Sequence, residues 1–311
     1  MLAKNRSFMR IVLTVFTLVL FLQLPVDAQA QRESFILDGE LKKTYKLNSG
    51  GSFSVSNVNG AVEIESWDRN EVEIEVIERR RGSDEIEVEF DVNDDRINVQ
   101  LYHDRDRWRG GRSSSANIRV KVPKKVELRA ETVNGDVTIE NIEGVVDAQT
   151  TNGDLRITGI AGDVEANTTN GRVEMEDITG EVNSTTTNAS IFVMRSNCRR
   201  MDLHTTNGRI RADFVFDDNG DYTFRTTNGD IEVAIPGNSK ADVDIVCRNR
   251  RFDTDFDELR EFERDLRRER DEDRRYRYSY DRDIRIRESI NGGGARLSIR
   301  TTNGDVSLRK K

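Results

Sequence analysis

Few residues of this 311-residue sequence are of the types that carry out acid–base, nucleophilic or metal chemistry. The sequence has two histidines, His103 and His204, and two cysteines, Cys198 and Cys247. A histidine becomes a base or a metal ligand when a carboxylate, a nucleophile or further ligands stand beside it. His103 falls in a polar, glycine-rich segment, residues 103–116, which we expect to form a loop. His204 directly precedes a Thr-Thr-Asn triplet, where we expect it to be exposed.

Motifs that hold such residues at working distances are absent from the sequence. It has no nucleophile elbow, no paired-histidine metal motif, no phosphate-binding loop and no Gly-Gly-x-Gly-x-Asp calcium repeat. We therefore predict no catalytic residue, no cofactor-binding residue and no metal ligand.

One group of carboxylates has a spacing that could give it a binding role. These carboxylates recur within successive repeats and are predicted to share a strand face: Asp147, Asp163, Glu165 and Glu181. Such a group attracts cations or a basic partner, and the alternative is a solvated acidic face without a ligand.

The elements that position these residues follow from an internal repeat. The unit is Thr-Thr-Asn-Gly, followed by a charged residue and an apolar one. The clearest copies are spaced 18, 18, 18, 19 and 21 residues apart, two weaker copies flank them, and a last copy closes the chain. Their asparagines are Asn59, Asn134, Asn152, Asn170, Asn188, Asn207, Asn228, Asn249 and Asn303.

Each unit predicts two short strands. Apolar residues stand three and five positions after the asparagine, as in Val137 and Ile139, and a second apolar set follows after a glycine turn. The unit is too short for a propeller blade and has no helical segment for a leucine-rich repeat. We predict an all-β protein, a right-handed parallel β-helix (β-solenoid) of ~18-residue coils stacked about 4.8 Å apart.

The Asn-Gly pair predicts a sharp corner in each coil. Asn and Gly tolerate positive φ best, so we expect a residue of this kind there. Stacked asparagines would also form an amide ladder along the axis. On this basis the asparagines are structural, and Cys198 and Cys247 lie in separate coils as two free thiols.

The segments outside the regular coils complete the domain organisation. Residues 31–131 alternate apolar and polar residues and predict an N-terminal antiparallel β-sheet cap, with the β-helix coils over 132–254. Residues 255–283 are rich in Glu and Arg and predict a charged insertion, either a short amphipathic helix or a disordered segment. Residues 284–311 return as the final β-helix coil.

The first 30 residues resemble a secretory signal peptide. A basic start, a 14-residue apolar run over 11–24 and Ala28-Gln29-Ala30 predict cleavage before Gln31. The alternative, an uncleaved anchor, needs about 20 apolar residues. The chain carries a net charge of −8, and this segment contributes three basic residues and one acid, so the rest is near −10. That balance argues against a nucleic-acid partner.

The chain resembles a bacterial family known as putative adhesins, exported β-helix domains of unknown function. The resemblance rests on Asn59-Gly60-Ala61-Val62-Glu63-Ile64, Trp67-Asp68, Val122-Pro123, the tandem repeats and the closing Asn291-Gly292-Gly293-Gly294, and it covers about residues 50–309. It implies a protein of the periplasm or cell surface and supplies no catalytic residue.

Three functions are compatible with this sequence. The first is a non-catalytic envelope or surface protein that presents a rigid, adhesion-like face to an unknown envelope polymer or protein. The second is a polysaccharide lyase or hydrolase, since β-helices include such enzymes, although coils this short leave little room for a groove. The third is a scaffold that assembles end to end, which capped ends would prevent.

Overall fold

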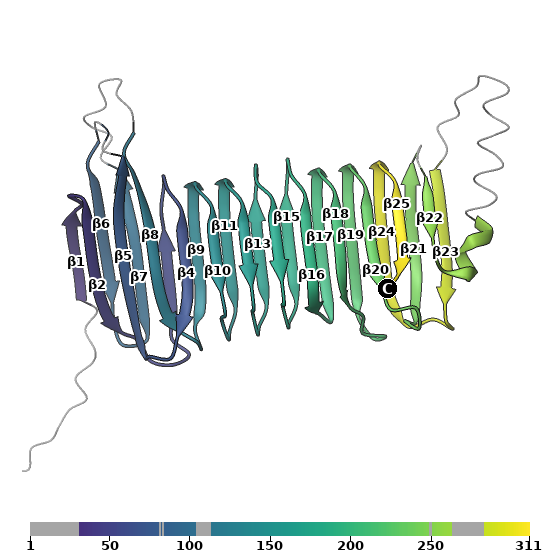
Figure 1. Cartoon of the computed structure of the whole chain (residues 1–311), viewed down its shortest axis with the longest axis horizontal. Helices are drawn as coiled ribbons and strands as arrows, with labels where there is room; N and C mark the ends of the chain where they lie inside the picture. The colour runs from purple at the N-terminus through teal and green to yellow at the C-terminus, as the bar shows by residue number, and fades with distance from the viewer. Residues whose placement is uncertain (1–30, 81, 83, 104–112, 249–250, 263–282) are drawn as a thin grey trace, which may run out of the picture.

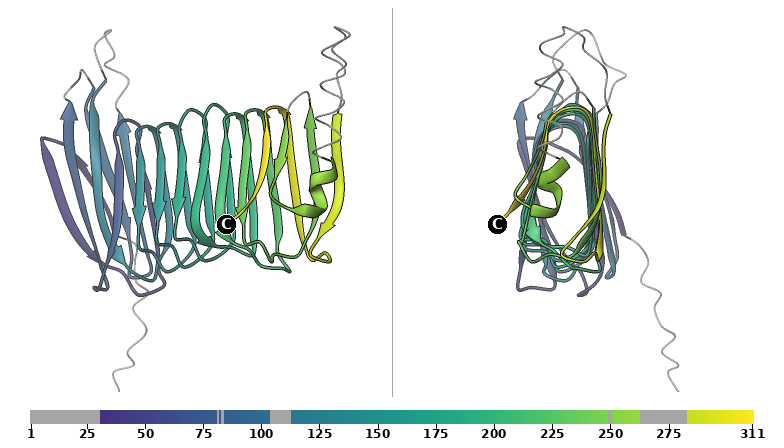
Figure 2. Two further views of the ribbon diagram at one scale, coloured as in Figure 1. Left: turned by 45° about the vertical axis from the view of Figure 1, so that its right-hand side comes forward. Right: turned by 90° about the vertical axis from the view of Figure 1, so that its right-hand side faces the viewer.

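Two long β-sheets face one another and enclose a single apolar core (Figures 1 and 2). The computed structural model describes residues 31–80, 82, 84–103, 113–248, 251–262 and 283–311. The expected signal peptide, residues 1–30, lies outside these residues. Among the described residues no helix has the length and apolarity to cross a bilayer.

We call the two sheets sheet A and sheet B. Within the described residues sheet A has thirteen strands, in the spatial order β1 (Gln31–Ile36), β6 (Ile86–Val92), β7 (Arg96–His103), β3 (Ser52–Ser56), β9 (Glu127–Asn134), β11 (Val146–Asn152), β13 (Val164–Thr168), β15 (Val182–Thr186), β17 (Arg200–Asn207), β19 (Asp221–Asn228), β24 (Ala295–Asn303), β21 (Ala241–Arg248) and β23 (Asp283–Ile290). Sheet B has twelve, in the order β2 (Glu40–Lys46), β5 (Glu71–Arg80), β8 (Ser115–Pro123), β4 (Val62–Trp67), β10 (Val137–Glu140), β12 (Leu155–Thr158), β14 (Val173–Glu176), β16 (Ile191–Asn197), β18 (Ile210–Val215), β20 (Ile231–Ile235), β25 (Val306–Lys310) and β22 (Phe252–Thr254).

Each central coil gives one strand to each sheet, so the protein is a flattened β-solenoid. From β9 to β20 the strands of successive coils pair in parallel, and Val146 stands directly between Leu128 and Val164. Period-two alternation sends Val137 and Ile139 inward, and both are completely buried. The β-solenoid predicted from the repeat is therefore confirmed.

Aromatic side chains fill the core where the repeat lengthens to 21 residues. Phe214 lies 4.8 Å from Tyr222 and 6.2 Å from Phe224 between ring centroids, and all three are fully buried. The Tyr222 hydroxyl donates a hydrogen bond of 3.0 Å to the Cys198 carbonyl. The larger rings occupy the extra space that a longer coil encloses.

The corner predicted at Asn-Gly has a different physical cause from the one expected. Positive φ occurs at the opposite corner instead, at Gly144, Gly162 and Gly180, whose φ angles are 151°, 158° and 153°. From Asn134 onward, none of the described Asn-Gly pairs that belong to the Thr-Thr-Asn-Gly repeat has a residue at positive φ. A very small residue is favoured there because the coils approach closely: an ideal Cβ at Gly171 would lie 1.6 Å from the Gly153 carbonyl oxygen.

The last coil in sequence is not the last coil in space. The expected final coil, formed by β24 and β25, is inserted between β19/β20 and β21/β22. Gly304 explains this preference, since a Cβ at Gly304 would lie only 1.7 Å from the Gly229 carbonyl oxygen. The weaker copy that precedes it in sequence carries Arg250 at that position, and it follows Asn249 outside the described residues.

The N-terminal end repeats this arrangement. Strands β1, β6 and β7, and strands β2, β5 and β8, pair antiparallel, as expected for the cap. The segment β3–β4 instead pairs in parallel on both sides and sits between later strands and the first central coil. Part of the region expected to be a cap is thus a coil of the solenoid.

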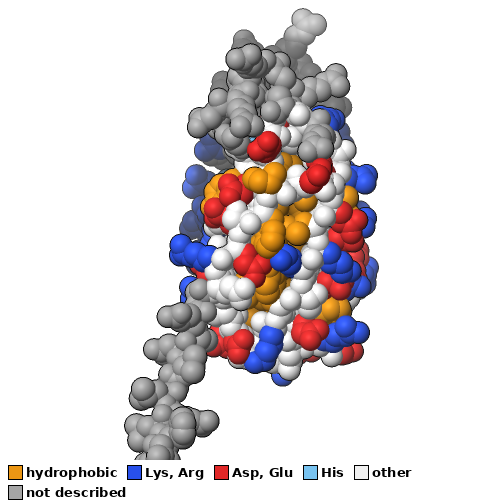
Figure 3. Space-filling model, turned by 90° about the vertical axis from the view of Figure 1, so that its left-hand side faces the viewer, with side chains coloured by type: hydrophobic (Ala, Val, Ile, Leu, Met, Phe, Trp, Pro, Cys, Tyr) orange, Lys and Arg blue, Asp and Glu red, His pale blue; other side chains and the backbone are white. Residues whose placement is uncertain are grey.

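The two ends of the core are covered differently. At the C-terminal end a 3-10 turn, η1 (Asp257–Leu259), lies over the opening between the sheets and buries Phe256 and Leu259 (Figure 2). Of the predicted amphipathic helix, Phe262 is 37% exposed and residues 263–282 lie outside the described residues. At the N-terminal end an apolar strip stays visible between charged margins (Figure 3).

Candidate functional site

Most positions of the Thr-Thr-Asn-Gly repeat are occupied by structural interactions. From Asn134 onward, each described asparagine of the repeat donates its Nδ2 to the Oδ1 of the asparagine on the neighbouring coil, with distances of 2.7 to 2.9 Å. The order of this amide ladder is Asn59, Asn134, Asn152, Asn170, Asn188, Asn207, Asn228 and Asn303. Asn303 stacks on Asn228 because of the inserted coil, and Asn249 lies outside the described residues.

The first threonine of each repeat is also structural. Thr150 is buried and its hydroxyl donates to the Gly135 carbonyl at 3.0 Å, and Thr226 bonds Gly208 in the same way. The residue after the glycine closes the corner as well: Asp136 Oδ1 accepts the backbone N–H of Asp154 at 2.8 Å. These bonds join successive coils and leave the groups unavailable to a ligand.

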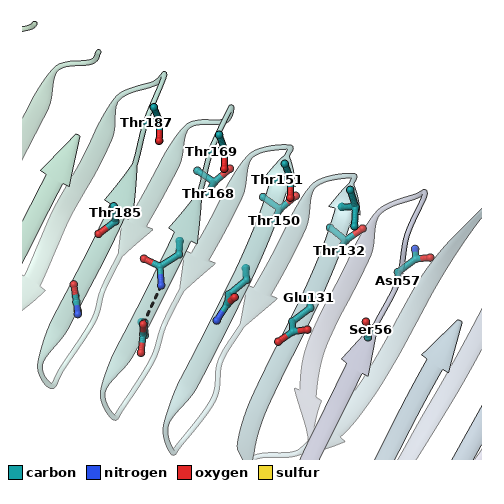
Figure 4. A pocket seen from close by; sticks show the side chains of 15 residues that line it. Ser56, Asn57, Glu131, Thr132, Thr150, Thr151, Thr168, Thr169, Thr185 and Thr187 are labelled. Atoms are coloured by element: carbon teal, nitrogen blue, oxygen red, sulfur yellow. Dashed lines mark hydrogen bonds between the residues drawn. The ribbon is translucent and has the colours of Figure 1, made fainter. Parts of the chain in front are cut away.

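The second threonine is the position of the repeat without such a partner. Within the described residues its hydroxyl makes no hydrogen bond in any copy. Thr151, Thr169 and Thr187 lie side by side on the outer surface of sheet A and are exposed (Figure 4). We call the six threonines at this position, which follow one another from coil to coil, the threonine row: Thr151, Thr169, Thr187, Thr206, Thr227 and Thr302. Val58 and Val133 precede them at the same position, and Arg248 follows them.

A second outward row runs beside the threonine row, three positions before each asparagine. Strand register aligns its members along the axis, and we call it the variable row because its residue type changes from coil to coil. In spatial order it consists of Ser56, Glu131, Gln149, Asn167, Thr185, His204, Arg225, Arg300 and Val246. Between Glu131 and Arg300 it passes from an acidic residue through neutral amides, a hydroxyl and a histidine to arginines.

The two rows border an open groove of about 660 Å³ on sheet A. Its lining reaches from Ser56 to Thr187 and consists mainly of hydroxyl and amide side chains. Successive coils place equivalent groups about 4.8 Å apart, so the groove presents hydrogen-bonding groups along a line. This arrangement suits an extended polar chain that lies along the axis.

The predicted acidic group is divided by the structure. Asp147 and Glu165 are register partners on sheet A, where Arg129 lies 3.3 Å from Asp147 and Asn167 donates to Glu165 at 2.9 Å. Asp163 and Glu181 lie in the turns that precede the strands. Asp163 accepts the backbone N–H of Glu181, and the Glu181 carboxylate pairs with Arg200 at 2.8 Å. The described residues contain no group of three or more potential metal ligands.

The two histidines differ in environment. His204 is exposed within the variable row, as predicted. The prediction that His103 belongs to a loop is wrong, because His103 ends β7 with only 5% of its side chain exposed. Its Nδ1 lies 2.8 Å from Asp84 Oδ2, and its Nε2 is buried without a partner among the described residues.

Asp84 is the centre of a buried polar cluster at this end. Burial raises the pKa of its carboxyl, but hydrogen bonds from His103, the Ser114 backbone and the hydroxyls of Ser114 and Ser113 outweigh that effect and hold the pKa well below its usual range. Ser114 also donates its hydroxyl to the Asp84 carbonyl at 2.6 Å. The cluster ties the start of β8 to the turn before β6, which is a structural role.

The cysteines are buried thiols, and no disulfide joins them. Burial raises the pKa of the Cys198 thiol to about 12, so it is protonated at neutral pH. Cys247 donates its thiol to the Gly304 carbonyl at 3.2 Å. Both therefore serve packing between coils.

Sequence reasoning missed the variable row as a site. The signal was present at a fixed offset from each asparagine, but the place of Arg300 beside Arg225 depends on the inserted coil. Aligning the copies by sequence order alone would have set Val246 there.

Comparison with known proteins gives a family and two distant structures. The family model described as Toastrack DUF4097 matches residues 52–309, which confirms the family resemblance drawn from the repeats. A crystal structure of a putative cell adhesion protein from Clostridium sporogenes shares 10% identity over 91% of this chain and 100% of that one, with a TM-score of 0.21. A putative adhesin from Bacteroides fragilis shares 11% identity over 88% and 97%, with a TM-score of 0.30. No functionally curated protein matches the chain.

Proposed function

We propose, on the premise that this chain belongs to the Toastrack DUF4097 family, that it is an exported, non-catalytic binding module for an extended envelope polymer. The observation that carries the proposal is the threonine row. The six threonines make no side-chain hydrogen bond among the described residues, yet threonine occupies this position in six consecutive coils, from Thr151 to Thr302. A line of exposed hydroxyls without partners in the protein supports a repeated contact with a ligand.

The chemistry of the groove favours polar recognition over bond cleavage. Its hydroxyls and amides donate and accept hydrogen bonds but do not titrate near neutral pH. Its two carboxylates are held on their own strands, Glu131 by Arg129 at 2.5 Å and Glu165 by Asn167 at 2.9 Å. Glycoside cleavage by acid catalysis uses one carboxylic acid that protonates the leaving oxygen and a second carboxylate nearby that acts as base or nucleophile.

Rigidity supports a binding role as well. The outer face of sheet A is fixed by the amide ladder and by the buried threonine bonds, so its side chains stand at a constant spacing before any ligand arrives. A preorganised surface loses less entropy on binding than a flexible one. An unbranched polymer with hydroxyl groups, such as a polysaccharide, matches a straight line of donors and acceptors.

Removing hydroxyls from the threonine row tests this proposal. The double variant Thr169→Val and Thr187→Val keeps the side-chain shape and the strand preference. We expect at least about a five-fold weaker retention of cell-wall polysaccharide by the chain from Gln31 onward, since each lost hydrogen bond is worth about 1 kcal/mol. Retention is measured by co-sedimentation with purified polymer.

The matched control removes two hydroxyls from the opposite sheet. Thr138→Val and Thr158→Val lie outward on β10 and β12 and should leave retention unchanged. Equal weakening in both variants would contradict a site on sheet A. Release of reducing or unsaturated sugar by the unaltered protein would instead establish an enzyme and refute the non-catalytic reading.

A further inference from the structure

Sheet A carries a second depression, of about 500 Å³, near the C-terminal end of the solenoid. Strands β19, β24, β21 and β23 meet there, and the groove of the threonine row leads toward it along the same strand face. Its charged lining consists of Arg225, Arg248, Arg285, Arg287, Arg300 and Asp244. We call these five arginines the arginine cluster.

The arginines are held close together by strand pairing. Arg225 stands directly opposite Arg300, and Val246 separates Arg300 from Arg285 in the same row. Neighbouring strands lie about 4.8 Å apart, and like charges directly opposite one another destabilise a sheet. The fold therefore bears a local repulsion, in a chain whose net charge is −8.

One carboxylate of the lining offsets part of this charge. Asp244 lies 3.2 Å from Arg300 Nη2 and 3.7 Å from Arg287 Nε. Each guanidinium group has five N–H donors in a fixed plane. A single carboxylate between two such groups can therefore accept only some of their hydrogen bonds. Arg287 and Arg300 thus have more N–H donors than Asp244 can accept.

A buried polar group without a hydrogen-bond partner among the described residues lies beside the cluster, on the strand that carries Arg300. Ser298 lies on β24 between Thr223 and Asp244, on the same strand face as Arg296 and Arg300. Ser298 is only 2% exposed, and its hydroxyl has no hydrogen-bond partner among the described residues.

We propose that the arginine cluster binds the carboxylate groups of an acidic polysaccharide whose chain continues along the groove of the threonine row. This inference rests on the proposed binding function and names the class of polymer. Arginine fits a carboxylate through two parallel hydrogen bonds. The neutral amides and hydroxyls of the remaining row fit sugar hydroxyls, so one linear molecule satisfies both ends of the variable row.

A glycan fits this pattern better than the other polyanions. A nucleic acid carries a phosphate at every residue, and it would meet Glu131, Asp147 and Glu165 at the other end of the same face. A membrane surface would need a broad basic face, whereas the arginine cluster is confined to the end strands of sheet A. A polysaccharide with carboxylates on some sugars and none on others avoids repulsion from the acidic end of the face and needs no broad basic surface.

The test compares polygalacturonate with the same polymer after methyl esterification, which removes the charge and keeps the sugar chain. Binding to the protein from Gln31 onward is measured by isothermal titration calorimetry. We expect polygalacturonate to bind at least ~10-fold more tightly than the ester, because charge-assisted hydrogen bonds are about twice as strong as neutral ones. The double variant Arg225→Gln and Arg300→Gln should abolish this preference.

The matched control removes two arginines from sheet B, Arg119→Gln and Arg211→Gln, which are 56% and 50% exposed. It changes the net charge equally and should keep the preference for polygalacturonate. Thermal unfolding provides a second readout: the single variant Arg225→Gln should not lower the melting temperature, since it relieves repulsion without breaking a packed contact. Loss of stability in that variant would show that the arginine is structural and overturn the inference.

Other outcomes separate this inference from the proposed function. Equal binding of the acid and ester forms would overturn the arginine inference and leave the binding module standing. Failure of both polymers and of purified cell-wall polysaccharide would refute both proposals. Arginine-dependent binding to phosphatidylglycerol vesicles without binding to polygalacturonate would overturn the glycan reading in favour of a lipid surface.

Discussion

The central coils and the two ends of this solenoid hold their strands in register by different means. Between β9 and β18 each strand pairs with the next coil in sequence, and axial bonds between identical residues repeat from coil to coil. At each end a coil is inserted between strands that are distant in sequence, β3–β4 near the N-terminus and β24–β25 near the C-terminus.

The difference affects how the molecule resists unfolding. A simple stack of repeats frays from its ends, because a terminal coil contacts only one neighbour. Here Asn228 and Asn303, 75 residues apart, share a side-chain hydrogen bond of 2.7 Å, and Asn59 and Asn134 share one of 2.9 Å across another 75 residues. Each inserted coil is thereby enclosed on both sides by segments remote in sequence.

The largest expected effect comes from breaking the close contact of the central coils. Gly171→Val adds a branched side chain at a position where even an ideal Cβ would lie only 1.6 Å from the Gly153 carbonyl oxygen. Ala189 occupies the same position in the next repeat, so one methyl group is accommodated, but a branched one forces the coils apart. We expect a loss of roughly 4 kcal/mol in the free energy of unfolding, measured by urea denaturation.

The comparison region supplies the control for this variant. Gly237, near the C-terminal end, has only the Lys310 side chain near its ideal Cβ, at 3.4 Å or more. Gly237→Val should change the unfolding free energy by less than about 1 kcal/mol. A similar cost at both glycines would mean that coil spacing is not the constraint at Gly171.

An intermediate effect is expected at the N-terminal end, where a polar cluster replaces the ladders. Asp84→Ala leaves His103, Ser113 and Ser114 without their shared acceptor, and we expect a loss of roughly 2 kcal/mol. The folded-state pKa of Asp84 is lowered, so its stabilisation is complete above the unfolded aspartate pKa of about 3.9.

That contribution must decline as the pH falls below about 4 and the carboxylate takes up a proton. Between pH 5 and 2, Asp84→Ala should therefore lose less stability than the unaltered chain. The measurement is the melting temperature of both proteins at several pH values across that range. Parallel pH curves for the two proteins would mean that Asp84 is not protected in the folded state.

The smallest effect is expected within the amide ladder. Asn170→Ala removes two side-chain bonds, to Asn152 and from Asn188, whereas Asn303→Ala removes one, to Asn228. Exposed bonds of this kind contribute at most about 1 kcal/mol each. We expect the central variant to cost about twice as much as the end variant in chemical denaturation. A larger cost at Asn303 would show that enclosure of the inserted coil depends on its one ladder bond.

The sequence by itself determined the repeating part of the protein. The 18-residue spacing, the alternation at Val137 and Ile139, and the recurring asparagine defined the coils and their amide ladder, because each coil uses local contacts and a neighbour of the same sequence. The free thiols and the exposed His204 followed from the same register.

Tertiary structure decided the features that depend on contacts remote in sequence. A small residue follows each asparagine of the amide ladder because the backbone carbonyl of the neighbouring coil leaves no room for a larger side chain, and the sequence alone does not reveal this contact. His103 is buried because Asp84 and Ser114 reach it from other segments. The arginine cluster exists because β24 enters between β19 and β21 and sets Arg300 beside Arg225. The sequence pattern within one repeat determines the structure of a coil, whereas the order in which the coils stack depends on which backbones can approach one another most closely.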